Sequence, residues 1–142
     1  MQPRDLDEAL DLIVKQDPRF PREAYDFMRE AVEFTQNAIR KANKNQPRHV
    51  TGQELLAGIR TFALEQYGPM ALTLFHEWGI RRCEDFGEIV FNLVDHEIFS
   101  KTETDSRQDF TGGYDFEETF RKPFKPARSV AGHPLPPRPR QG

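Results

Sequence analysis

The sequence predicts a mainly α-helical domain with a winged-helix-like three-helix core. Three observations carry this prediction. Apolar residues recur at helical spacing through residues 6–94, a capping box stands at 51–54, and the pattern changes to alternation after residue 98. The expected order is two leading helices, three core helices and a C-terminal β-hairpin. An irregular all-α bundle is the alternative.

The two leading helices are predicted from apolar stripes and proline stops. The first stripe comprises Leu6, Leu10, Ile13 and Val14, and it ends before Pro18. Pro21 then suits the first position of a helix, where its missing N–H has no partner to lose. A second stripe consists of Ala24, Phe27, Ala31, Phe34 and Ala38. It predicts a long helix that ends before Pro47.

Three further helices are expected over 51–67, 69–78 and 83–97. Thr51 and Glu54 have the spacing for reciprocal side-chain to backbone hydrogen bonds, so a helix begins there. Gly68 can end this helix and Pro69 can begin the next, which stops at Gly79. The last helix is predicted from an apolar stripe of Phe86, Ile89, Val90, Leu93 and Val94.

Residues 98–116 are predicted to form a hairpin, the wing of the winged-helix interpretation. Phe99, Lys101 and Glu103 would point to one side of a strand, with their neighbours on the other. Past Gly112-Gly113, residues 114–116 can supply the returning strand. A plain loop at these glycines is the alternative.

Charge divides the chain into a domain over 1–120 and a tail over 121–142. The domain holds 14 basic and 23 acidic residues, a net charge of −9, and the tail holds six basic residues and no acid. Six of the eleven prolines also lie in the tail. Because proline removes backbone donors and blocks helix and sheet, the tail is expected to be basic, Pro-rich and extended or flexible.

Composition limits the cellular compartments in which the protein is expected. No apolar run approaches the ~18 residues of a membrane-spanning helix, so no membrane partner is expected. Acidic residues between 5 and 11 replace the apolar core of a secretory signal. Cys83 is the only cysteine, which leaves no intrachain disulfide. These observations predict a cytoplasmic protein.

Enzymatic chemistry is a minority hypothesis, carried by Cys83. This thiol follows Arg81-Arg82 at a predicted helix start, where positive charge and the helix dipole are expected to lower its pKa. No histidine has a spacing that identifies it as the base, so a packing role is favoured. The chain contains no phosphate-binding glycine loop, no nucleophilic serine motif and no paired-histidine metal motif, and we expect no cofactor and no metal.

The leading interpretation is a non-enzymatic protein-binding or adaptor module. Five aromatic residues fall within fifteen positions of acidic or Pro-containing chain, where hydrated rings would be unfavourable. They are the candidate contact strip for a protein partner or a second copy of the chain, and packing against the helical body is the alternative. The five are Phe110, Tyr114, Phe116, Phe120 and Phe124.

The alternative interpretation is an RNA- or ribosome-associated factor that uses a basic corner, residues 40–48, and the tail. Lysine and arginine there can release counterions from phosphate. DNA readout is disfavoured, because the predicted helix over 83–97 carries five acids and no base. The candidate RNA-binding residues are Arg40, Lys41, Lys44, Arg48, Arg121, Lys122, Lys125 and Arg128.

Several stretches resemble a family of small planctomycete and verrucomicrobial proteins of unknown function. The resemblance covers about residues 5–126 and implies membership without an activity, a ligand or a catalytic residue. The matching stretches lie at 48–56, which reads Arg-His-Val-Thr-Gly-Gln-Glu-Leu-Leu, and at 67–72, 78–80, 84–91, 101–102, 105–107 and 114–116.

Overall fold

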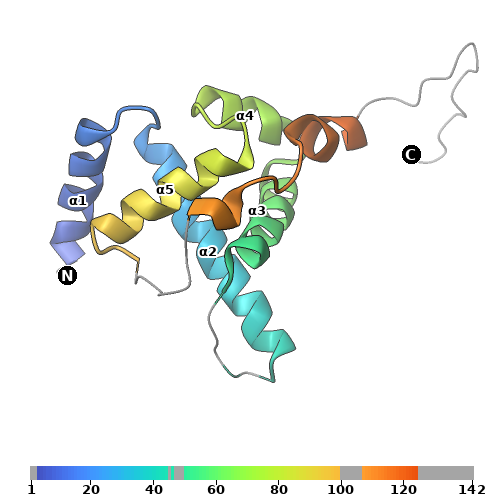
Figure 1. Cartoon of the computed structure of the whole chain (residues 1–142), viewed down its shortest axis with the longest axis horizontal. Coiled ribbons are helices and arrows are strands. Elements are labelled where there is room, and N and C mark those ends of the chain that lie inside the picture. Colours follow the sequence, from blue (N-terminus) through green and yellow to red (C-terminus); the bar gives the residue numbers. More distant parts are fainter. Residues whose placement is uncertain (1–2, 45, 47–49, 100–106, 125–142) are drawn as a thin grey trace, which may run out of the picture.

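A computed structural model describes residues 3–44, 46, 50–99 and 107–124, and in this part of the chain the protein is built from five α-helices and four short helical turns (Figure 1). The α-helices are α1 (Pro3–Gln16), α2 (Arg22–Ala42), α3 (Gly52–Tyr67), α4 (Ala71–Glu77) and α5 (Cys83–Asp95). The short turns are η1 (Gly68–Met70), η2 (Arg107–Phe110), the π-helical η3 (Glu117–Arg121) and η4 (Lys122–Phe124).

The predicted C-terminal hairpin is wrong, and with it the winged-helix-like architecture. No strand occurs among the described residues, and the all-α alternative fits. Within the predicted hairpin, residues 100–106 lie outside the described part, while 107–110 and the chain from 116 form helical turns. The physical reason is the spacing of Phe116 and Phe120, which lets one helical turn direct both rings into the core.

The predicted helices over the first 97 residues occur close to their expected bounds. Pro21 precedes α2 as its N-cap instead of being its first residue. Thr51 and Glu54 form the predicted capping box: the Thr51 hydroxyl accepts from the Glu54 N–H at 3.1 Å, and the Glu54 carboxylate accepts from the Thr51 N–H at 3.0 Å. These bonds satisfy two backbone donors and fix where α3 begins.

The antiparallel pair α2 and α3 forms the most extensive helix contact. The two backbones come close at Gly58, where a Cβ atom would lie 1.8 Å from the Thr35 Oγ1. Thr35 is buried and donates its hydroxyl to the Ala31 carbonyl at 2.8 Å, so its polar group is satisfied within α2. Glycine at position 58 therefore permits the close approach of these two helices.

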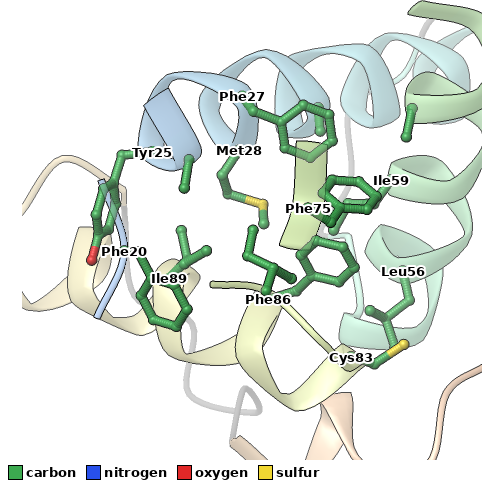
Figure 2. Packing of buried hydrophobic residues seen from close by; sticks show 14 of the residues in the cluster. Phe20, Tyr25, Phe27, Met28, Leu56, Ile59, Phe75, Cys83, Phe86 and Ile89 are labelled. Carbon is green, nitrogen blue, oxygen red and sulfur yellow. The ribbon is translucent and has the colours of Figure 1, made fainter. Parts of the chain in front are cut away.

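An aromatic cluster occupies the centre of the core. The Phe75 ring of α4 is fully buried and lies 5.2–5.7 Å, centroid to centroid, from four other phenylalanine rings. Figure 2 shows it between α2, α3 and α5, with Phe27 on one side and Phe86 on the other. The four neighbouring rings belong to Phe27, Phe86, Phe116 and Phe120.

A polar network joins the turn between α1 and α2 to α5. The Asn92 side-chain amide donates to the Asp17 carboxylate at 2.9 Å and to the hydroxyl oxygen of the buried Tyr25 at 3.0 Å. Arg19 pairs with Asp17 at 2.6 Å and with Glu88 at 3.3 Å. The Arg19 guanidinium holds the pKa of Asp17 well below its usual range. This network fixes α1 on the helical body.

Candidate functional site

The C-terminal arm, defined here as residues 107–124, covers the ends of α3, α4 and α5. Its first turn, η2, lies against two glycines on different helices: a Cβ atom at Gly52 would lie 2.6 Å from Asp109 Cβ, and one at Gly87 would lie 3.0 Å from Phe110 Cβ. The η3 turn packs on α4 and η1. The arm is therefore part of the core.

The five aromatic residues of the candidate contact strip differ in exposure. Phe110, Phe116 and Phe120 are buried, so they pack against the body and present no surface to a partner. Tyr114 is half-buried, and its hydroxyl donates to the Leu56 carbonyl at 2.8 Å while Arg60 lies 5.9 Å from the ring centroid. Phe124 alone is largely exposed, at 43%.

An exposed methionine that the sequence patterns did not single out lies near the same end of the body. Met70 is 54% exposed in η1, the turn that contacts η3. Together with Phe124 it contributes two of the three large exposed hydrophobic residues in the described part of the chain. The third, Leu12, lies on α1. We call Met70 and Phe124 the apolar edge.

The acidic residues of α5 have contacts within the molecule. Asp85 accepts from the Arg81 backbone N–H at 2.8 Å, and Glu84 accepts from the Gly112 N–H at 3.4 Å. Glu88 pairs with Arg19. Carboxylates at the first turn of a helix also oppose its positive dipole end. These contacts account for much of the acidic character of α5 without a partner.

Cys83 is buried beneath the arm. Its Sγ accepts from the Tyr114 N–H at 3.4 Å and donates to the Tyr114 carbonyl at 3.5 Å. Burial raises the pKa of the Cys83 thiol, and the nearby Glu84 carboxylate acts in the same direction, although the Tyr114 hydrogen bond opposes them. The expected lowering of this pKa is therefore wrong, because desolvation outweighs the helix N-terminus. The environment favours the packing role over a catalytic thiol.

We expect a thiol reagent to modify Cys83 only when the arm opens. In native buffer at pH 8 the reaction should be at least ~100-fold slower than in denaturant, because the buried thiol needs local opening of the chain. Phe116→Ala should accelerate the reaction by loosening the arm, whereas Phe124→Ala should leave it unchanged. Stopped-flow absorbance with a disulfide reagent measures these rates. Native kinetics equal to those of the denatured chain would contradict the burial of this thiol.

The basic corner has a described part at the end of α2. Arg40, Lys41 and Lys44 are exposed on the last turns of this helix and the residues that follow it. Thr35 is the last buried residue of α2, and Figure 1 shows the helix continuing beyond the start of α3. We call residues 36–44 the α2 tip. No acidic residue occurs between Glu33 and Glu54, so this segment has the most consistently positive charge of the domain.

The ion pairing of the α2 tip differs from that of other basic residues. In the described ranges, Arg40, Lys41 and Lys44 have no carboxylate within salt-bridge distance. Arg121 and Lys122, also candidates for RNA contact, pair with Glu117 at 2.8 Å and Glu118 at 3.0 Å. Three further candidates, Arg48, Lys125 and Arg128, lie outside the described residues. The structure thus exposes one unneutralised group of cations from this set.

The three comparisons supply no relative for the chain. No family model, no curated protein and no solved structure matched it. The resemblance to the planctomycete and verrucomicrobial family stays a prediction from the sequence. Within the described ranges, no helix is long and apolar enough to span a bilayer, and no three histidine, cysteine or acidic side chains gather as a metal-ligand group.

Proposed function

We propose that this protein is a non-enzymatic binding module and that the α2 tip is its contact surface for RNA. One observation carries the proposal. Arg40, Lys41 and Lys44 are exposed together on a helix end that extends past the core, and no described carboxylate neutralises them. Some basic residues elsewhere in the described chain pair with acids, as Arg19, Arg22 and Arg29 do.

The charge distribution of the domain favours the approach of a polyanion to the α2 tip. The domain carries a net charge of −9, so most of its surface repels phosphate and the α2 tip is where a polyanion can approach. Cations at a helix C-terminus also interact favourably with the helix dipole, by about 0.3–1 kcal/mol each. That contribution stabilises α2 but does not account for the absence of ion pairs to Arg40, Lys41 and Lys44 among the described residues. A contact with phosphate would use both the positive charge of the α2 tip and its lack of ion pairs.

Neutralising the α2 tip should weaken RNA binding. Three cations on a single strand predict a salt slope of roughly −2 for log K against log [salt], which is about a 20-fold loss of affinity between 50 and 200 mM salt. We expect Arg40→Gln/Lys41→Gln/Lys44→Gln to weaken binding of a labelled single-stranded RNA at least ~10-fold at low salt and to flatten the slope. Fluorescence anisotropy measures both quantities.

The chain offers a matched control for this experiment. Arg81 and Arg82 are also exposed, and their side chains have no described carboxylate partner, but they precede α5 on the body instead of extending from it. Arg81→Gln/Arg82→Gln should therefore retain binding within about twofold. An equal loss in both variants, or no salt-dependent retention of RNA by the wild-type protein at 50 mM salt, would overturn the proposal. Equal competition by polyglutamate would instead identify a site for acidic protein.

A second candidate function is protein binding through the apolar edge. The observation that favours it is the exposure of Met70 and Phe124 on turns that both adjoin η3. Large exposed apolar side chains are enriched where proteins dock. Met70→Ser/Phe124→Ser would leave the buried rings of the arm unchanged, and loss of a co-purifying protein in this variant alone would support the candidate. Recovery of the same proteins with the wild-type chain and with Met70→Ser/Phe124→Ser would count against this candidate.

A further inference from the structure

The α2 tip carries amide side chains beside its cations. On α2, Gln36 and Arg40 are four residues apart, as are Asn37 and Lys41, so each amide has a cation one turn further along the helix, and Lys44 follows the helix end. All five side chains are exposed.

Within the described ranges, Gln36 and Asn37 form no hydrogen bond that joins parts of the fold. Neither side chain has a hydrogen-bond partner among the described residues. Amides elsewhere do have such roles: Asn43 donates to the Gln46 carbonyl at 3.1 Å, Gln53 donates to the Asp109 carbonyl at 2.6 Å, and Asn92 joins two elements. Asparagine within a helix is also less favourable than alanine by about half a kcal/mol. These two amides are free to contact a ligand.

Amide side chains recognise one base in particular. Asparagine and glutamine can form a bidentate pair with adenine, accepting from its N6 amino group and donating to its N7. In double-stranded RNA this edge lies in a deep, narrow groove that side chains cannot enter, whereas an unpaired strand presents it openly. A helix end that extends from the body is therefore suited to single strands.

The acids next to the tip set the orientation of a bound strand. Glu30 and Glu33 lie one to two turns toward the core from Gln36 and Asn37 and are exposed. They repel phosphate, so the backbone of a bound strand would lie over the three cations and its bases would extend toward the amides. Resting on the proposed RNA contact, we infer that Gln36 and Asn37 give the α2 tip a preference for adenine in single-stranded RNA.

The test compares labelled twelve-nucleotide oligomers of adenylate, uridylate and cytidylate by fluorescence anisotropy. The full-length wild-type protein should bind the adenylate oligomer about tenfold more tightly than the other two, which corresponds to one good bidentate pair. Gln36→Ala/Asn37→Ala should bind all three alike, with the uridylate affinity and the salt slope unchanged. Because alanine favours a helix, this variant should melt at or above the wild-type temperature, which excludes unfolding as the cause.

The outcomes separate this inference from the proposal on which it rests. If the wild-type protein binds all three oligomers equally, or if Gln36→Ala/Asn37→Ala keeps the adenylate preference, the base contact is contradicted and the phosphate contact stands. If no oligomer binds at 50 mM salt, the proposed function fails and the base preference fails with it. Loss of the preference in Arg40→Gln/Lys41→Gln/Lys44→Gln, at high protein concentration where binding is still measurable, would assign discrimination to the cations instead and overturn the inference.

Discussion

Replacing Phe75 with alanine is expected to lower the free energy of unfolding by about 4 kcal/mol. The ring is fully buried and contacts rings from α2, α5 and η3, so its removal leaves a cavity that rigid neighbours cannot fill. Phe116 and Phe120 would lose the surface on which they pack, and the arm should detach before the helices unfold. Urea unfolding followed by circular dichroism measures the loss.

A graded series keeps this prediction testable if the alanine variant does not fold. Phe75→Leu retains most of the buried volume and should cost about 1–2 kcal/mol. Leu12→Ala removes an exposed apolar side chain and should change stability by less than about 0.5 kcal/mol. A Phe75→Leu cost no greater than that of Leu12→Ala would show that the aromatic cluster does not hold the core together.

The second large effect is expected at the crossing of α2 and α3. Gly58→Ala should destabilise the protein by about 2 kcal/mol. Overpacking costs about 1–3 kcal/mol and occasionally more, and the better helix propensity of alanine returns about 1 kcal/mol. We expect the upper end of the cost, because the new Cβ would lie 1.8 Å from Thr35 Oγ1 and a β-branched side chain in a helix has few other rotamers.

A double-mutant cycle tests whether Thr35 is the cause. Thr35→Ala removes the nearest atom and leaves Cβ, which would lie 2.8 Å from the new methyl group, so it should recover a large part of the loss when combined with Gly58→Ala. Thr61→Ala, at an exposed position of the same helix, serves as the control and should be nearly neutral. Additive costs at positions 35 and 58 would refute the close approach.

The helices could be predicted because their signals are local. The capping box at Thr51 and Glu54 depends on residues three apart, and it forms as expected. The apolar stripe of α2 predicts its buried face as far as Ala31, while its last member, Ala38, is exposed and the helix ends at Ala42. What these patterns do not contain is the closeness of α2 and α3 at Gly58, because a helix crossing depends on the shapes of two surfaces.

The hairpin prediction failed where local patterns conflict. Tyr114-Asp115-Phe116 after two glycines resembles a returning strand, yet Phe116 and Phe120 also have helical spacing. The rings are buried against Phe75, and this tertiary packing decides in favour of the helical turn. The same burial removes three of the five rings from the candidate contact strip. From the sequence, clustered aromatics indicate that they must be covered but not whether the cover is the same chain or another.

The basic part of the candidate site could be found from charge alone, since the segment between Glu33 and Glu54 contains no acid. Which of the candidate cations form ion pairs could not be predicted. Arg121 pairs with Glu117 and Lys122 with Glu118 only because this segment forms the helical η3 turn, where the sequence predicted an extended tail from residue 121. Gln36 and Asn37 carried no recognised motif. Their signal is structural: they lie exposed on α2 past its last buried residue.

The most direct test of RNA binding by the α2 tip is an amide NMR titration of the ¹⁵N-labelled full-length protein with a single-stranded adenylate oligomer at 50 mM salt. The cross-peaks of residues 36–44 should shift in a saturable manner and return as salt is raised to 300 mM, while those of Met70 and Phe124 remain in place. An unchanged spectrum, or shifts confined to the apolar edge, would contradict the account.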